Sequence, residues 1–398
     1  MFSILATSVV IASDLPKFDP PPDEVVYRGV TEEQWETISS IGDPLNCRQQ
    51  VFDLQNLDLT EFHELTPENC SNKDCIARAL ITYSKVILRE GIYKINELDL
   101  TSKILIGHPN ETIILNASKA SIALKMRKSI IANLIIQNAR DNGVMLRNDN
   151  LVYRTVVGNT GLYYPASTRG IGFVQKGSFG SKNNCIVSAE AYNGYNYKSS
   201  YGAGVNGGAA DGFDAKFLSS KDLTFIDAHG HHNSDHGFDF YCSGNKEGAP
   251  VARLYYSSAI KNKNPYKSGG DGGGIKVGGE YAEPECNRSV EKKSPRILYS
   301  TVSCYNPKED ITNQNNIKLK KIKSSNDPYK LKCSDFSYVK KIKKRSFDIG
   351  INKCEEKIEK QCLVEKCDTA NVTKGKCFSY LDKLCMNSKE AEILQKCY

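Results

Sequence analysis

Acidic residues and one lysine recur at the same position behind three glycines between residues 211 and 276. The segments read DGFDAKF, DHGFDFY and GGGIKVG, and the glycine is followed each time by an apolar, a charged and a second apolar residue. The charged residues are Asp214, Asp239 and Lys276. Carboxylates and a lysine held close together are the groups that cation binding and proton transfer use.

The alternation within each segment predicts a half-buried strand. Gly143 and Gly170 open similar segments, and the shortest glycine spacings are about one turn of a parallel β-helix. Neighbouring turns of such a solenoid share one core, which places side chains at one offset about 4.8 Å apart. We therefore expect an all-β parallel β-helix with Asp214, Asp239 and Lys276 in one outward column. Asp211 and His236, each just before its glycine, should form a second column.

The N-terminal region combines a predicted arm with a predicted cap. The proline-rich residues 13–41 predict an extended arm with little structure, within an N-terminal region of residues 13–66. Between Pro67 and Lys85, the apolar spacing predicts a helix that covers the open end of the solenoid. The apolar positions of this helix are Ile76, Leu80, Ile81 and Tyr83. Its N-cap is predicted to be Ser71 or Asn72. Residues 85–118 alternate in short runs and predict the first turns.

The sequence changes character after residue 305, where we place the end of a β-helix domain that begins at residue 67. Residues 306–345 predict a basic linker, and residues 346–398, with six cysteines, predict a Cys-rich C-terminal module. The basic stretch could bind a polyanion, act as a nuclear signal or be a solvated linker, and charge runs are most often solvated.

Several features indicate export. Residues 1–12 form an apolar run ending in Val-Ile-Ala, which predicts a secretory signal peptide, with a buried strand as the alternative. The chain has fourteen cysteines, which predicts disulfide bonds. Five N-glycosylation sequons are present, at Asn69, Asn110, Asn116, Asn287 and Asn371.

The charge and the expected compartment together limit the partners. No later segment approaches the roughly 18 apolar residues of a membrane span. The formal charge of +7 favours polyanions, and export favours acidic polysaccharide over nucleic acid. We expect a secreted, extracellular monomer that binds neither membranes nor nucleic acid.

The three motifs together resemble those of the family 9 polysaccharide lyases, pectate lyases built on a right-handed parallel β-helix. The family segments ADGF-A-AK, NNSDDGWD and G-GNGFK-GG correspond here to ADGFDAK (210–216), HNSDHGFD (232–239) and DGGGIKVGG (271–279). The resemblance covers residues 85–305. It implies a calcium cofactor, polygalacturonate (de-esterified pectin) as substrate, and cleavage by β-elimination.

Carried over by position, the resemblance implies that Lys276 abstracts the proton on ring carbon 5 of a galacturonate unit. Three aspartates stand where the family has calcium ligands: Asp211, Asp235 and Asp239. His236 stands where the family has a further aspartate, and imidazole is a poor ligand for a hard cation. Asp214 stands where the family usually has alanine, and we hypothesise that it restores the lost carboxylate. Alternatively, His236 has shifted the metal preference or abolished binding.

Three flanking residues are candidates for substrate binding. Lys216 could contact a substrate carboxylate, Tyr241 could stack on a sugar ring, and Arg169, just before Gly170, could lie in a subsite. Ordinary surface positions explain each of them as well. The histidines at 229–232 have no cysteine in zinc-ligand spacing, which disfavours a zinc site.

The expected chemistry sets a condition on the lysine. A base must be neutral, yet a lysine with a pKa of about 10.4 is only about one per cent neutral two units lower. A nearby calcium would lower the pKa of Lys276, whereas Asp239 without calcium would favour the ammonium. The leading hypothesis is a secreted calcium-dependent pectate lyase. The alternatives are a non-catalytic β-helical protein that binds acidic polysaccharide, and a hydrolase with paired carboxylates.

Overall fold

The computed structural model describes residues 30–321, with gaps at 119, 162–168, 177–180, 197–207, 217–222, 244–251, 261, 263–271, 279–295, 300, 305, 307–310 and 314–318. These residues all belong to one compact unit, Tyr27–Lys340. The predicted signal peptide and the predicted Cys-rich module lie outside the described residues.

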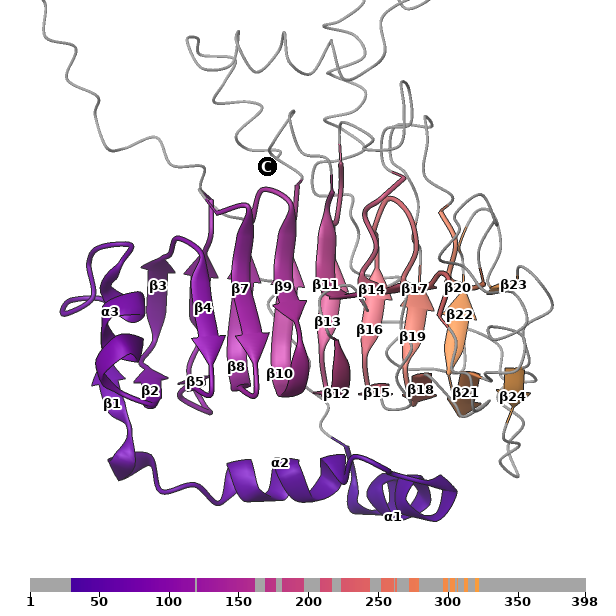
Figure 1. Ribbon diagram of the computed structural model, residues 1–398, viewed down its shortest axis with the longest axis horizontal. Helices are drawn as coiled ribbons and strands as arrows, with labels where there is room; N and C mark the ends of the chain where they lie inside the picture. The colour runs from indigo at the N-terminus through magenta and orange to yellow at the C-terminus, as the bar shows by residue number, and fades with distance from the viewer. Residues whose placement is uncertain are drawn as a thin grey trace, which may run out of the picture. The chain divides into compact units, whose positions relative to one another are not determined.

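Parallel strands stack turn upon turn along one axis, as a β-helix requires (Figure 1). An eight-stranded sheet contains β4 (Leu98–Thr101), β7 (Ile122–Arg127), β9 (Asn142–Leu146), β11 (Ile171–Lys176), β14 (Phe213–Lys216), β17 (Phe238–Phe240), β20 (Ile275–Val277) and β23 (Ile311–Asn313). These strands are neighbours in chain order, each one turn after the last. The prediction of an all-β parallel β-helix is confirmed.

A 16-stranded sheet forms the other faces of the coil. Its main path is β1 (His63–Leu65), β2 (Lys85–Leu88), β5 (Ile104–Gly107), β8 (Ile130–Gln137), β10 (Asn148–Gly158), β12 (Lys182–Val187), β15 (Leu223–Ile226), β18 (Ala252–Tyr255), β21 (Arg296–Tyr299) and β24 (Leu319–Lys321). Its remaining strands are β3 (Gly91–Lys94), β6 (Ile113–Asn116), β13 (Glu190–Tyr192), β16 (His229–His231), β19 (Ser258–Ile260) and β22 (Val302–Cys304). The long strands β8 and β10 pair with both sets.

The interior is a continuous apolar core made by the inward residues of every turn. Phe173, Phe213 and Phe238 stack at centroid separations of 5.0 and 4.8 Å, one ring per turn. The residues that follow Phe213 and Phe238 are Asp214 and Asp239, so burial of these phenylalanines determines which face the charged residues occupy.

The register differs from the predicted one in a single turn. Phe173 pairs with Val144 and with Phe213, so the glycine that leads this turn is Gly172 and not Gly170. A Cβ on Gly172 would lie 2.7 Å from the carbonyl oxygen of Gly212 in the next turn. Gly172 is therefore needed at this position, because the backbones of successive turns approach each other too closely for a larger residue.

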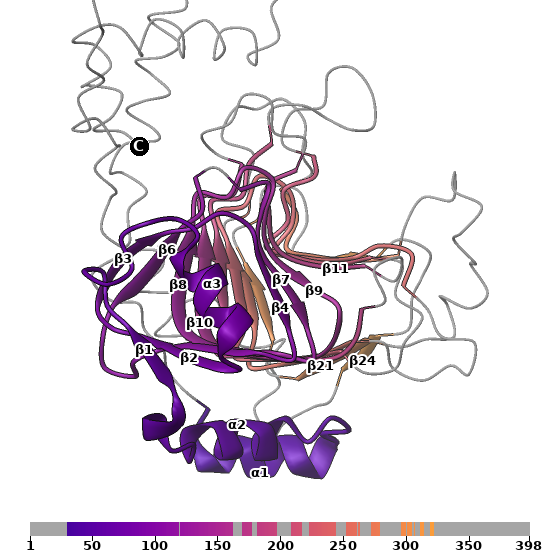
Figure 2. The same cartoon turned by 60° about the vertical axis from the view of Figure 1, so that its left-hand side comes forward.

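The prediction of an unstructured arm is wrong for residues 32–41. These residues form α1 (Glu32–Ile41), and α2 (Cys47–Gln55) and the short η1 (Leu59–Glu61) follow. Thr31 and Gln34 form a capping box, and Trp35 and Ile38 are buried. Both helices pack on the outer apolar face of the 16-stranded sheet, below the strands in Figures 1 and 2.

The apolar outer face explains why these helices form. Outward residues such as Leu151 and Val187 would be exposed to water without a cover, and α1 and α2 bury them together with their own apolar stripe. A disulfide bond between Cys47 and Cys185 fixes α2 to β12.

The predicted capping helix is confirmed as α3 (Cys75–Thr82), with Ile76 and Leu80 in the core. Its N-cap is Asp74, three residues after Ser71 and two residues after Asn72, the predicted alternatives. Ile81 is 81% exposed and Tyr83 is 42% exposed, so they do not belong to the buried stripe. Cys70 and Cys75 form a disulfide bond at the start of the helix.

The β-helix continues beyond the predicted boundary at residue 305. β23 pairs with β20 and β24 pairs with β21, which carries the solenoid to Lys321. The first part of the predicted basic linker is therefore one more turn. Of the helices in the described part of the chain, none is long and apolar enough to cross a membrane.

Candidate active site

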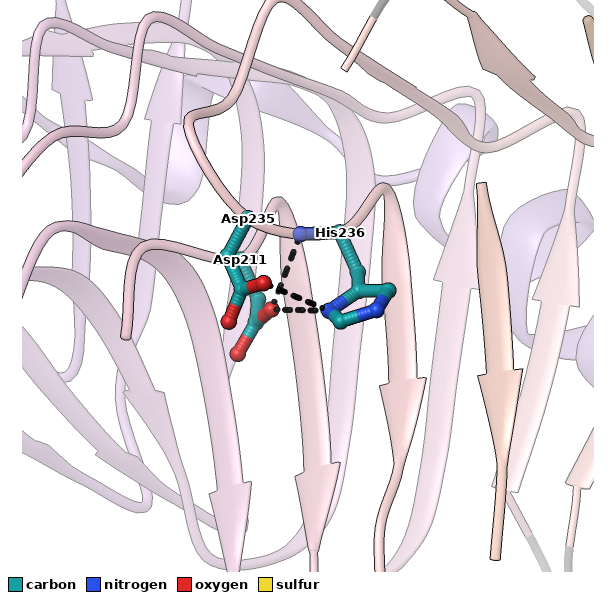
Figure 3. Close-up of side chains that lie close together, drawn as sticks. All are labelled: Asp211, Asp235 and His236. Carbon is teal, nitrogen blue, oxygen red and sulfur yellow. Dashed lines mark hydrogen bonds and ion pairs between the residues drawn. The ribbon is translucent and has the colours of Figure 1, made fainter. Parts of the chain in front are cut away.

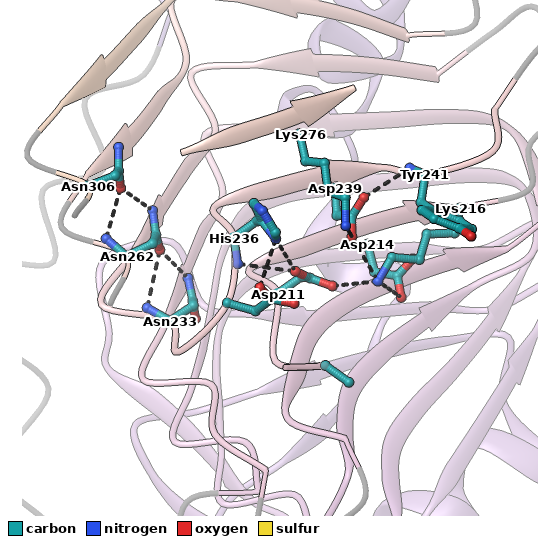
Figure 4. Close-up of polar contacts among 12 residues, drawn as sticks. Asp211, Asp214, Lys216, Asn233, His236, Asp239, Tyr241, Asn262, Lys276 and Asn306 are labelled. Carbon is teal, nitrogen blue, oxygen red and sulfur yellow. Dashed lines mark hydrogen bonds and ion pairs between the residues drawn. The ribbon is translucent and has the colours of Figure 1, made fainter. Parts of the chain in front are cut away.

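Strand register brings the three charged residues of the outward column together. Asp214 on β14 pairs with Asp239 on β17, and Asp239 pairs with Lys276 on β20. Both aspartates are buried, whereas Lys276 keeps partial exposure. The Nζ of Lys276 lies 4.0 Å from Oδ2 of Asp239 (Figure 4). The column predicted from sequence is confirmed.

Lys216 lies inside the carboxylate cluster. Its Nζ is 2.8 Å from Oδ2 of Asp211, 2.9 Å from Oδ2 of Asp239 and 3.7 Å from Oδ2 of Asp214. The predicted role was contact with a substrate carboxylate. The structure instead gives the ammonium three carboxylates of the protein itself, and Lys216 neutralises part of their charge.

His236 and two aspartates form a second cluster that shares Asp211 with the first. The Nδ1 of His236 lies 3.0 Å from Oδ1 of Asp235 and 3.5 Å from Oδ1 of Asp211 (Figure 3). The backbone N–H of His236 also donates to Oδ1 of Asp211 at 3.1 Å. Asp211 therefore presents Oδ1 to His236 and Oδ2 to Lys216. The predicted second column is confirmed.

Burial and mutual attraction act in opposite directions on the cations of this site. Burial lowers the pKa of Lys216, but the four aspartates outweigh it and hold that pKa well above its usual value. Burial likewise lowers the pKa of His236, and the carboxylates, Asp235 foremost, outweigh burial and raise it to about 10.

Lys276 follows the same rule as Lys216. Burial lowers its pKa, and Asp239 and then Asp235 more than offset this, so the pKa of Lys276 is raised. The direction agrees with the expectation that Asp239 favours the ammonium when no cation is nearby. Burial raises the pKa of Asp239, but Lys216 and Lys276 outweigh burial and lower it.

The sequence matches a family model over the part of the chain that forms this coil. The model, described as Pel9A-like, right handed beta helix region, matches residues 81–344. The chain belongs to the Pel9A-like right-handed β-helix family. This assignment agrees with the resemblance found in the three motifs and gives the handedness of the coil.

Similar solved structures show low sequence identity. The crystal structure of pectate lyase Pel9A is 17% identical, with a TM-score of 0.44, over 62% of this chain and 65% of that chain. The catalytic domain of a GH87 α-1,3-glucanase in complex with nigerose is 10% identical, with a TM-score of 0.25, over 67% of this chain and 69% of that chain. The A-module of the Azotobacter vinelandii mannuronan C-5 epimerase AlgE4 is 10% identical, with a TM-score of 0.22, over 62% of this chain and 95% of that chain.

The chain spans slightly less than two thirds of the Pel9A chain. None of the curated proteins matches the sequence.

The candidate metal ligands of this Pel9A-like chain offer two kinds of donor atom. Among the described residues, atoms that could share one ion within 4.8 Å of one another come from Asp211, Asp235 and His236. Calcium takes six to eight oxygen ligands, and one of these three donors is an imidazole nitrogen. The set therefore does not fit the all-oxygen cage that calcium prefers. Asp239 and Asp214 face Lys216, which does not support the hypothesis that Asp214 restores the missing ligand.

The other predicted site residues occupy different positions. Tyr241 lies beside Lys276: its ring is 5.4 Å from Nζ of Lys276, and its backbone N–H donates to Oδ1 of Asp239 at 2.9 Å. Arg169 lies three residues before Gly172, outside the register that suggested it, and it is half-buried. The histidines of β16 pair with carboxylates outside this cluster. His229 lies 2.8 Å from Asp227, and His231 lies 2.7 Å from Glu190.

An asparagine ladder supports the turn that carries Asp235 and His236. The backbone N–H of Asn233 donates to Oδ1 of Asn262, and that of Asn262 donates to Oδ1 of Asn306, at 3.1 and 2.9 Å (Figure 4). Sequence reasoning missed this ladder. The available signal was the recurrence of asparagine after β16 and β19, one turn apart.

Proposed function

We propose that this protein is a secreted polysaccharide lyase that cleaves polygalacturonate by β-elimination, with Lys276 as the base. The observation that carries the proposal is the position of Lys276. Lys276 is partly exposed, whereas the carboxylates of the same column are buried, and its Nζ lies 4.0 Å from Oδ2 of Asp239 and 5.4 Å from the centre of the Tyr241 ring.

The reaction needs a base close to a uronate ring and positive charge near the uronate carboxylate. Lys276 in its neutral form would take the proton from ring carbon 5, and the electrons would form the double bond to carbon 4 as the glycosidic oxygen leaves. Tyr241 beside the lysine offers an aromatic surface for a sugar ring. Lys216 and Asp239 would position the base through their ion pairs and need not contact the substrate.

The cation that the resemblance implies is calcium, with Asp211, Asp235 and Asp239 as its ligands. Whichever dication occupies the site would supply positive charge toward the substrate carboxylate and disfavour the ammonium form of Lys276.

Features outside the site support the proposed export. The described residues contain the disulfides Cys47–Cys185 and Cys70–Cys75, which are typical of oxidising compartments. Asn69 and Asn110 are exposed and accessible to glycosylation, whereas Asn116 is only 2% exposed inside the coil. We expect glycans at the first two and none at Asn116.

A non-catalytic protein that binds acidic polysaccharide is the second candidate. The observations that favour it are His236 in place of a carboxylate and the raised pKa of Lys276, which both reduce the expected lyase chemistry. Binding of polygalacturonate without any product would support it.

The test is the release of unsaturated uronide from polygalacturonate, with added divalent cations and with chelator. The Lys276→Met variant should lose product formation by about 10²–10⁴-fold, the usual contribution of a positioned base. Lys125→Met is the matched control, because Lys125 stands in the same outward column on β7, five strands or about 24 Å away. No product from the unaltered protein with any cation would refute the lyase.

A further inference from the structure

The donors around His236 differ from a calcium cage in number and in kind. Asp211, Asp235 and His236 each offer one ligand atom, and these three atoms lie within 4.8 Å of one another. All three side chains are buried, with relative exposures of 0%, 4% and 0%. Figure 3 shows the imidazole directed toward the two carboxylates from the neighbouring position of the turn.

The imidazole of His236 has a second unusual property. Its Nε2 makes no hydrogen bond with a described residue although the ring is fully buried, and its Nδ1 has only the two carboxylates as partners. A buried polar atom without a hydrogen bond costs about 1–3 kcal/mol. Nδ1 faces two carboxylate oxygens at 3.0 and 3.5 Å, and metal ligands that surround one ion share this arrangement. Ligands about 2.1 Å from a small ion are roughly 3.0–3.4 Å apart at octahedral or tetrahedral angles.

The other two aspartates, Asp214 and Asp239, face Lys216. The Nζ of Lys216 lies 2.9 Å from Oδ2 of Asp239 and 3.7 Å from Oδ2 of Asp214, and it also pairs with Oδ2 of Asp211. The ligand set open to an ion therefore contains two carboxylates and one imidazole. Carboxylate and water suit calcium, magnesium and manganese, whereas imidazole suits zinc, copper, iron and nickel.

We propose that Asp211, Asp235 and His236 form a site for a transition-metal dication of the zinc or cobalt class, which binds there more tightly than calcium. The inference rests on the proposed function for its role, since this dication would replace calcium beside Lys276. Binding itself does not depend on lyase activity.

The experiment compares Zn²⁺, Co²⁺ and Ca²⁺ on the intact, metal-free protein by calorimetry, with the visible absorption of bound Co²⁺ as a spectroscopic readout of nitrogen and oxygen ligands. We expect one site at which Zn²⁺ and Co²⁺ bind at least about tenfold more tightly than Ca²⁺. Tighter binding of Ca²⁺, or no binding of Zn²⁺ and Co²⁺, would overturn the proposal without any variant.

Two variants locate the site. His236→Asp should weaken Co²⁺ binding and shift the ratio of affinities toward Ca²⁺ by at least about tenfold. His232→Gln is the control for the other histidines of this turn, and it should leave the tight Co²⁺ site unchanged. An unchanged ratio in a folded His236→Asp protein would refute the assignment.

The outcome separates this inference from the lyase. Lys276→Met should bind Co²⁺ like the unaltered protein even though it forms no product. A lyase that works with Ca²⁺ and binds it most tightly would refute the transition-metal site and leave the proposed function intact.

Discussion

Asp239 and Lys276 are paired residues on adjacent strands of the eight-stranded sheet, and the carboxylate Oδ2 lies 4.0 Å from the ammonium nitrogen. The proposed base therefore faces a carboxylate that belongs to the same column and that also pairs with Lys216 at 2.9 Å. Among the carboxylates, Asp239 thus has the largest effect on how readily Lys276 gives up its proton.

Asp239→Asn should lower the pKa of Lys276. Asp239 is the largest influence that raises this pKa, and an amide removes the charge while its oxygen can still accept from the Tyr241 N–H. Because the neutral amine then appears at lower pH, acylation of Lys276 followed by mass spectrometry should show its pH midpoint moving to lower pH. Asp99→Asn is the matched control, since Asp99 stands in the same column on β4. A midpoint that stays in place would contradict the assignment.

The charged columns could be predicted from sequence because a β-helix repeats one rule in every turn. Phe213, Phe238 and Ile275 must face inward, so the residues that follow them must face outward at the same height. The predicted alignment is wrong for one turn, because Gly170 and Gly172 both precede an apolar residue. Sequence alone cannot tell which of these two glycines aligns with Gly212 of the next turn.

The contacts between clusters could not be predicted in the same way. Register places Lys216 near Asp239, but the choice between a substrate and three aspartates depends on burial, which strand spacing does not determine. The helices α1 and α2 were missed because the prolines before residue 23 suggested an extended segment. The capping signal at Thr31 and Gln34 was present, but the apolar outer face that stabilises α1 is formed by strands far along the chain.

Gly237→Ala should destabilise the coil by about 1–3 kcal/mol, the usual cost of overpacking. A Cβ there would lie 2.7 Å from Cβ of Ala259 and 2.8 Å from Nδ2 of Asn262, so the next turn and the asparagine ladder would both have to move. Urea denaturation monitored by circular dichroism measures the change. A free energy of unfolding within about 0.5 kcal/mol of the original would show that the close approach is not real.

Tyr255→Phe should make the protein less sensitive to alkali. Burial raises the pKa of Tyr255 to about 12, and its hydroxyl donates to the carbonyl of Gly42 at 2.8 Å, between α1 and α2. The folded state thus favours the neutral phenol, whereas an unfolded tyrosine ionises near pH 10. The stabilisation is fully present below about pH 10 and is lost as the pH rises through about 12.

The free energy of unfolding measured from pH 8 to 12 tests this prediction. At pH 8 the variant should lose about 1 kcal/mol with the hydrogen bond, and its stability should fall less steeply above pH 10. Tyr83→Phe, at a position 42% exposed, is the matched control. Equal slopes for Tyr255→Phe and the unaltered protein would refute the coupling.

Removal of the Cys47–Cys185 disulfide should cost more than removal of the Cys70–Cys75 disulfide, because the first closes a loop of 138 residues and the second a loop of 5. Chain entropy alone gives roughly 5 and roughly 2 kcal/mol for loops of these lengths. The double variants Cys47→Ser/Cys185→Ser and Cys70→Ser/Cys75→Ser avoid unpaired thiols, and urea denaturation compares them directly. Equal losses of stability in the two variants would mean that non-covalent contacts, among them the apolar packing and the hydrogen bonds of Tyr255 and Gln55, are enough to hold α1 and α2.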